Sequence, residues 1–413
     1  MTADGEASYS SGGIFYGWIV VIAAFFAFGI VFGAVTYSYT IFVDPIATAF
    51  NTSTTRVLFG FTLTNIGTGV LGVYAGRFLL RVRVRLGLLA GLVIMALGFL
   101  GLSVINALWQ LYLLYGIIIA FGSMVVAPLG ASSMVANWFT ANRGRALTMA
   151  TLGTSFGQLL IPRLAAWVIS GWDWQTAYRV FALLMVLVIP VIVLIAVDRP
   201  EDKGMQPYGG SAGAKGASGE APPLLASRDI LRRLDFWSIG LSYLLTVTVY
   251  LALVAVMVPY ARTYGVSALE ASQLTVCMGV FAIIGKFAFA TWTDRIGLRN
   301  TFWIAVGLNL AACILLVAVP GYPALFVASA LVGGSAGGIL PLWPGLIAFR
   351  FGRHALPQVM GLMSPMILII QGFGAPFATA MHFRPAYFVF IAMLIGSLIV
   401  SRRLNRPPAD QLI

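Results

Sequence analysis

The sequence predicts an all-α integral membrane protein in which twelve transmembrane helices form two six-helix bundles. Three observations support this prediction: the composition, the length of the apolar runs and one long polar break between them. The 413 residues are 60% hydrophobic and only 9% charged, and the mean hydropathy is +0.94. No soluble domain has such a composition.

The apolar runs are long enough to cross a bilayer, which takes about 20 mostly apolar residues. Six of them precede the polar break, near residues 15–43, 54–76, 86–105, 108–136, 146–170 and 176–197. Six more follow it, near residues 236–261, 270–293, 300–319, 323–348, 355–381 and 385–401. The first run is far longer than the core of a cleavable signal peptide, so we expect it to remain as a helix.

The polar break from Asp198 to Leu234 is rich in glycine and serine and contains Pro222 and Pro223. Such a composition cannot bury a core and predicts a flexible linker. The predicted domains are therefore an N-terminal bundle, a cytoplasmic linker and a C-terminal bundle, over residues 1–197, 198–234 and 235–413.

The two halves resemble each other at matching helix junctions. The segment 143–147 (RGRAL) corresponds to 352–356 (GRHAL), and the segment 72–77 corresponds to 290–295. A six-helix period joined by a linker is typical of carriers that work by alternating access.

The net charge of +12 is explained by topology and not by nucleic-acid binding. Of the 25 Lys and Arg residues, nineteen lie on one side of the predicted topology, in the even-numbered connections and the C-terminal tail. Only four lie on the other side, namely Arg56, Arg179, Arg262 and Arg384. The positive-inside rule then places both termini and the linker in the cytoplasm of a multi-pass protein, which we expect in a bacterial inner membrane.

The two remaining basic residues, Arg163 and Lys286, lie inside apolar runs, where the chain places none of its 13 acidic residues deeply. A cation at membrane depth is costly and marks a pathway for an anion. Lys286 lies eight residues before Asp294, about 12 Å along the helix. The alternative for Lys286 is a side chain that extends to the cytoplasm. For Arg163, beside Pro162, the alternatives are an outer attractor for anions and a purely structural role.

The segment Asp294-Arg295-Ile296-Gly297-Leu298-Arg299 resembles the cytoplasmic signature of the major facilitator superfamily. Further segments resemble its monocarboxylate transporter and oxalate:formate antiporter branch, namely residues 16–18, 40–46, 138–146 and 171–174. The resemblance covers residues 15 to about 401 and implies the major facilitator fold and transport by alternating access.

This resemblance implies a cytoplasmic gate formed by Asp294, Arg295, Gly297 and Arg299, with Asp294 and Arg299 as the pair that joins neighbouring helices in one conformation. The alternative is that these residues only cap and orient helices. In the first half, Gly76 occupies the acidic position, so this half departs from the pattern.

The resemblance also implies a carboxylate-binding site at Lys286, where the branch usually carries Arg, with Tyr37 as a hydroxyl donor. Other candidates are polar or aromatic side chains at membrane depth: Arg163, Asn65, Tyr250, Trp343 and Gln371. Asn65, Tyr250 and Gln371 can instead bond a neighbouring helix, and Trp343 can simply pack against its neighbours. Trp343 stands between Pro341 and Pro344, which predict a broken helix. A second cation near Ile367 and a histidine before Pro259 are both missing from the sequence.

We therefore expect a secondary active transporter of organic monocarboxylates, by proton symport or anion exchange. The alternative is an exporter of amphipathic drugs or metabolites. A membrane enzyme would need clustered His, Asp, Glu or Cys at membrane depth, and Cys277 and Cys313 stand alone in their predicted helices. We expect no metal and no cofactor, and a monomer whose partners are substrate, lipid and possible coupling protons, with no nucleic acid.

Overall fold

The computed structural model describes residues 15–209, 226–265, 268–319 and 321–402. Within these ranges every regular element is a helix, and the β structure is limited to one isolated parallel bridge between Phe139 and Tyr208. Twelve helical segments of the described chain are long and apolar enough to cross a membrane. The predicted all-α, multi-pass membrane fold is confirmed.

The first half of the chain supplies six of these segments, and most begin and end within a few residues of the predicted runs. They are α1 with η1 (Tyr16–Val31, Phe32–Tyr37), α3 (Thr54–Arg81), α4 (Val84–Leu102), α5 to α7 with η2 and η3 (Leu108–Leu113, Leu114–Ile119, Ala120–Met124, Val125–Ala131, Ser132–Trp138), α8 (Arg143–Gly171) and α9 (Trp174–Ile195). Asp173 caps α9, because its Oδ1 accepts from the Thr176 amide at 2.6 Å.

The first span is interrupted within the predicted run 15–43. The segment η1 is a π-helical turn, and Ser38 then donates both its amide (3.0 Å) and its hydroxyl (2.7 Å) to the carbonyl of Gly33. A separate helix, α2 (Tyr39–Ala49), follows. Such π-helical turns are frequent at functional sites, and this one carries Tyr37.

The second half begins with α10 (Ser227–Arg232) and continues with six spans. They are α11 (Leu234–Arg262), α12 (Ala268–Ile296), α13 (Leu298–Ala318), α14 (Tyr322–Phe351), α15 with η5 and α16 (Leu356–Ile370, Gln371–Phe373, Gly374–Ala380) and α17 (Arg384–Ser401). The predicted break around Trp343 is wrong, since α14 stays helical through Pro341 and Pro344. Packed neighbouring helices can tolerate proline within a membrane helix.

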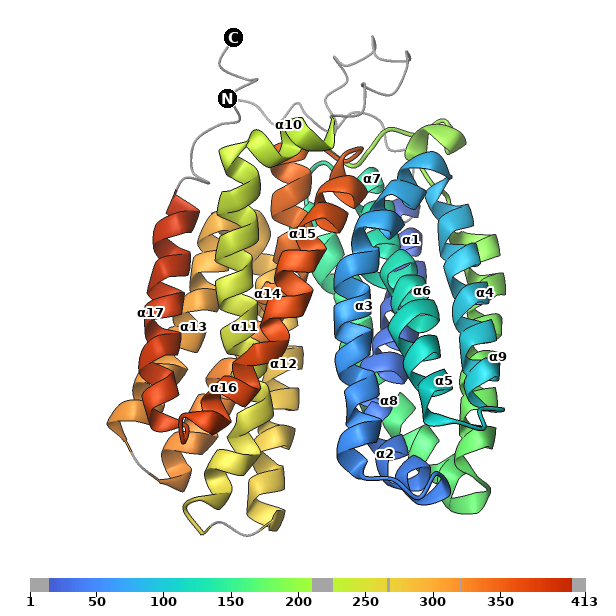
Figure 1. The fold of residues 1–413 in the computed structure, drawn as a ribbon. Coiled ribbons are helices and arrows are strands. Elements are labelled where there is room, and N and C mark those ends of the chain that lie inside the picture. The colour runs from blue at the N-terminus through green and yellow to red at the C-terminus, as the bar shows by residue number, and fades with distance from the viewer. Residues whose placement is uncertain (1–14, 210–225, 266–267, 320, 403–413) are drawn as a thin grey trace.

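The twelve spans form two bundles that stand side by side (Figure 1). We call the end at which α10 lies the linker end. The bundles meet mainly through α3 against α15 and through α8 against α12 and α14. In Figure 1 the two bundles approach each other at the linker end and diverge toward the opposite end.

An apolar seam joins the halves at the linker end. The hydrophobic core of the second half includes residues of the first half, namely Ala75, Leu79, Met124, Val125, Leu129 and Ala136. Ser364 of α15 also donates its hydroxyl to the carbonyl of Gly69 in α3, at 3.0 Å. The structure therefore shows a conformation in which the linker end is closed.

Residues 198–209, which we call the strap, are ordered although they belong to the predicted flexible linker. The Tyr208 amide donates to Trp138 O, and its carbonyl accepts from the amides of Thr140 and Ala141, all within 3.0 Å. The strap therefore packs on the first bundle. The glycine-rich stretch 210–225 lies outside the described residues, and the domain boundaries stay a prediction.

Candidate functional site

Lys286 lies in α12 on the face that meets the other bundle, and its side chain is only 2% exposed. Close packing of α12 on α14 fixes this face: a Cβ atom at Gly337 would collide with the backbone of Gly285 and Lys286. Small residues at membrane helix contacts permit such an approach. Helix α14 therefore packs against the backbone of Lys286, while the Lys286 side chain extends to α8.

The ammonium group of Lys286 makes three hydrogen bonds, all to α8. Its Nζ donates to Thr151 O at 2.9 Å, to Thr154 Oγ1 at 2.7 Å and to Ser155 Oγ at 2.7 Å. An ammonium group has three donors, so these bonds use all of them. Among the side chains that the structure describes, no carboxylate pairs with Lys286.

Neutral partners leave the charge of Lys286 uncompensated. Burial of a charge in a low-dielectric interior is costly unless an opposite charge or several hydrogen bonds offset it. Three neutral oxygens supply the bonds but not the charge. The side chain reaches sideways to α8 in this conformation, which differs from the predicted alternative of an extension toward the cytoplasm.

Aromatic side chains extend this site. The hydroxyl of Tyr37 in η1 lies within hydrogen-bonding distance of the Thr154 side chain. The hydroxyl of Tyr250 in α11 lies near those of Tyr37 and Tyr243. Tyr243 stacks on Trp343 of α14, with ring centroids 4.9 Å apart and an interplanar angle of 13°. The indole Nε1 of Trp343 is buried and has no hydrogen-bond partner among the described residues. It is therefore a buried donor that remains available for a hydrogen bond.

These neighbours connect four of the predicted contact residues: Lys286 and Tyr37 both lie at Thr154, Tyr250 lies near Tyr37, and Trp343 is connected through Tyr243. The other three lie apart in the described contacts. Asn65 donates to Phe61 O of its own helix at 2.9 Å, and Gln371 is half-buried in the turn η5. Arg163 is exposed and lies eight residues beyond Ser155, about 12 Å along α8.

Sequence reasoning missed the partners of Lys286 on α8. Thr148, Thr151, Thr154 and Ser155 follow one another at helical spacing, so they share a face of α8. A stripe of hydroxyl groups on a membrane helix is a signal for hydrogen bonding between helices. Read together with a lone lysine in another span, this stripe could have predicted the contact.

The predicted gate at the end of α12 is described only in part, because the Asp294 side chain lies outside the described residues. Arg299 donates to the amide oxygen of Asn300 at 3.0 Å and lies over the Trp303 ring at 4.7 Å. Arg295 is exposed, and Gly297 forms the turn into α13 with φ of +83°. The pairing of Asp294 with Arg299 stays a prediction.

A different contact at the linker end joins the halves directly. Arg353 of the second half donates to Glu201 Oε1 of the strap at 2.7 Å and to the Asn137 carbonyl of α7 at 3.0 Å. The strap is in turn bound to the first bundle, since Asp198 accepts from the Arg85 amide at 2.6 Å. Arg353 therefore bridges the two bundles in the closed conformation.

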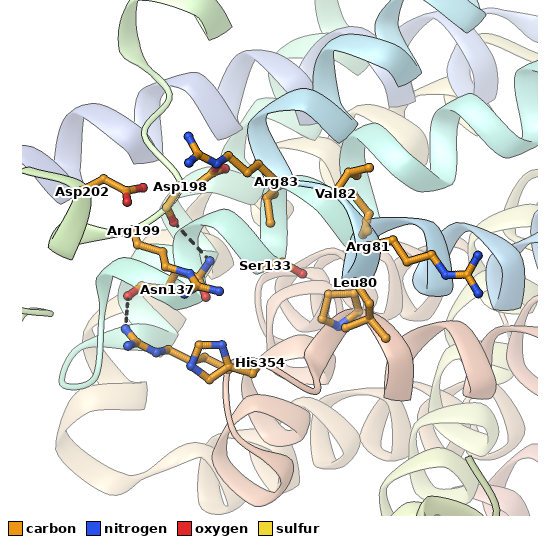
Figure 2. A pocket seen from close by; sticks show the side chains of 14 residues that line it. Leu80, Arg81, Val82, Arg83, Ser133, Asn137, Asp198, Arg199, Asp202 and His354 are labelled. Atoms are coloured by element: carbon orange, nitrogen blue, oxygen red, sulfur yellow. Dashed lines mark hydrogen bonds between the residues drawn. The ribbon is translucent and has the colours of Figure 1, made fainter. Parts of the chain in front are cut away.

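A pocket of about 590 Å³ lies beside this bridge (Figure 2). Both halves and the strap contribute to its walls, which carry Arg81, Arg83, Asp198, Arg199, Asp202, Arg353 and His354 among other residues. The walls carry four arginines and two aspartates, so the pocket has an excess of positive charge that the aspartates offset only in part. We interpret the pocket as part of the closure at the linker end.

Loss of the bridge should weaken closure of the linker end. Glu201→Gln removes the charge partner of Arg353, and an exposed pair of this kind is worth about 0.2–1 kcal/mol, at most about a fivefold change in the ratio of closed to open protein. The reporter is a cysteine at Thr293, which is 5% exposed, in a background without Cys277 and Cys313. This cysteine should react faster with maleimide in Glu201→Gln than in the otherwise unchanged protein.

The charge swap Glu201→Arg with Arg353→Glu is the matched control for this prediction and should restore the slow reaction. Equal labelling rates in the wild type, the single variant and the swap would assign Arg353 a local role only.

Acid should affect the strap through Asp198. Burial raises the pKa of this carboxyl, and the nearby charge of Asp202 adds to the effect, although the Arg85 amide acts against it. The folded state then holds this proton more tightly than the unfolded state, so the contribution of Asp198 to stability falls as pH rises from about 4. Asp198→Asn should flatten the dependence of the melting temperature on pH above that value, with Asp229→Asn as a control. A steeper dependence in the variant would contradict this prediction.

Comparisons with known proteins identify the family of the chain. The model of the Major Facilitator Superfamily matches residues 17–285 and 239–412. The oxalate:formate antiporter of Oxalobacter formigenes is 24% identical over 94% of this chain and 93% of its own. Monocarboxylate transporter 12 of Rattus norvegicus is 23% identical over 100% of this chain and 91% of its own.

Solved structures show the same fold at low identity. The proton:xylose symporter XylE superposes with a TM-score of 0.74 at 15% identity, over 94% of this chain and 95% of its own. The human organic anion transporter MFSD10 superposes with a TM-score of 0.67 at 14% identity, over 94% of this chain and 98% of its own. The predicted family resemblance is confirmed. The chain therefore belongs to the Major Facilitator Superfamily and is a secondary transporter of small molecules rather than an enzyme.

Proposed function

We propose that the protein carries organic monocarboxylate anions across a bacterial inner membrane by alternating access. The observation that carries this proposal is the Lys286 ammonium, buried where the two bundles meet and bonded only to neutral oxygens among the described residues. A substrate carboxylate would supply the missing negative charge.

The surroundings of Lys286 favour a substrate with one charge and an apolar or weakly polar body. Tyr37 and the free indole N–H of Trp343 can donate hydrogen bonds to oxygen atoms of the substrate. Tyr243 and Tyr250 add aromatic surface. The relatives named for oxalate, formate and monocarboxylates support a carboxylate as the charged group.

The distribution of basic residues favours a cytoplasmic linker end. Closure at that end then corresponds to an outward-facing carrier, in which an anion from outside reaches Lys286 before the bundles rock. Asp294, Arg295, Gly297 and Arg299 would act with the Arg353 bridge as the cytoplasmic gate. Arg163, farther out on α8, would attract the anion on its way in. We expect the carrier to act as a monomer, surrounded by lipid.

Stabilisation by ligands tests this proposal on the purified protein. Lactate, pyruvate, formate and benzoate should be compared at equal concentration, with lactamide as the neutral control for lactate. At least one carboxylate should raise the melting temperature, since a ligand stabilises the state that it binds, and Lys286→Gln should remove the shift. Stabilisation only by uncharged amphipathic compounds would favour an exporter instead.

A further inference from the structure

The three oxygens that hold Lys286 belong to the opposite bundle, so the bonds cross the interface that must change during transport. They come from α8, while Lys286 stands on α12. Two are side-chain hydroxyls, and the third is the carbonyl of Thr151, which also accepts the Thr154 hydroxyl at 2.9 Å. Thr154 therefore donates its own hydrogen to Thr151 and accepts from Lys286.

These hydroxyls can serve either an ammonium or a carboxylate, because a hydroxyl both accepts and donates. Without an anion they accept from Lys286. A carboxylate that arrives at Nζ forms shorter and stronger charge-assisted bonds than a neutral oxygen does. The Ser155 hydroxyl is then free to turn and donate to that carboxylate, beside the hydroxyl of Tyr37.

We propose that Thr154 and Ser155 are substrate-binding residues which, in the empty carrier, hold the Lys286 ammonium in place of the substrate and so make the protein an exchanger of anions. This inference rests on the proposed function above. An empty carrier that opens its linker end must pull Lys286 away from α8 and leave a buried ammonium without acceptors, which is costly. A loaded carrier moves with the charge already compensated, so reorientation is fast only with an anion bound.

The first test needs no substrate. With the Thr293→Cys reporter in a background free of Cys277 and Cys313, the double variant Thr154→Val with Ser155→Ala should raise the maleimide labelling rate about tenfold or more, as expected for loss of hydrogen bonds to a charged group. Thr148→Val is the matched control, because its buried hydroxyl bonds to Gly144 O of its own helix at 2.8 Å.

The same double variant in a Lys286→Ala background separates this role from packing. If the hydroxyls act by holding Lys286, their substitution should add little once the lysine is gone. An equal increase in both backgrounds, or no increase in either, would overturn the proposal.

The second test compares two fluxes of ¹⁴C-lactate from proteoliposomes, efflux into buffer and efflux into unlabelled lactate. The wild type should release label at least tenfold faster into lactate, and the double variant should lose much of this ratio because net efflux rises. Equal fluxes in the wild type would overturn the exchange mechanism and leave carboxylate transport intact. Absence of any lactate flux or lactate-induced stabilisation would count against the proposed function for this anion, while the labelling test still decides whether the hydroxyls hold Lys286.

Discussion

Replacement of Lys286 by alanine or glutamine is expected to abolish carboxylate uptake into proteoliposomes while the protein still folds and inserts. Each charge-assisted bond to the substrate contributes about 1.5–3 kcal/mol, so affinity should fall at least about tenfold. Folding should survive, because Thr154 keeps its bond to Thr151 O and the variant removes a buried charge that has no counter-charge among the described side chains.

Arginine at this position should retain carboxylate binding and change how transport is coupled to protons or to a second anion. Its guanidinium keeps the positive charge but presents a planar fork in place of the compact ammonium group. Uptake and melting temperature should be measured together for all three variants, with Thr148→Val as the folded control. Uptake at the wild-type rate by a folded Lys286→Ala protein would refute the central role of this residue.

Substitution of Gly76 should have the second-largest effect, through closure of the linker end. A Cβ atom at this position would collide with the carbonyl oxygen of Pro357 and lie 3.3 Å from the Gly361 Cα in α15. Overpacking of a tight contact costs about 1–3 kcal/mol, or about five- to 150-fold in the ratio of closed to open protein. Gly76→Ala should therefore open the linker end, and Gly76→Asp should do so more strongly.

The reporter at Thr293 would detect this opening as faster maleimide labelling, and uptake should fall in parallel. Gly307→Ala is the matched control, because a Cβ atom there meets nothing within 4 Å. Unchanged labelling in Gly76→Asp would show that α3 and α15 can separate without loss of the closed state.

Gly76 also explains the departure of the first half from the family signature. An acidic side chain has no room there in the closed conformation, since α15 occupies the space. The negative charge that faces the second half at this end comes instead from Glu201 of the strap, which pairs with Arg353. The sequence reveals the missing acid, but its replacement lies about 125 residues away in a segment predicted to be flexible.

The sequence alone determined the twelve spans and the position of the buried cation. Hydropathy over about 20 residues depends on each segment by itself, so the predicted runs agree with the helices except near Ser38 and Gln371, where a local turn interrupts the α-helix. The prolines of α14 do not interrupt that helix. A lysine inside such a run signals function in the same local way.

Only the tertiary structure decided what Lys286 contacts. Thr151, Thr154 and Ser155 precede it by more than 130 residues, and which face of α8 meets α12 depends on how the two bundles dock. The same docking sets Gly76 against Pro357 and leaves Asn65 on its own helix. Contacts between the two bundles arise from the packing of their surfaces and from the conformation of the carrier, and neither is encoded in the hydropathy of a single helix.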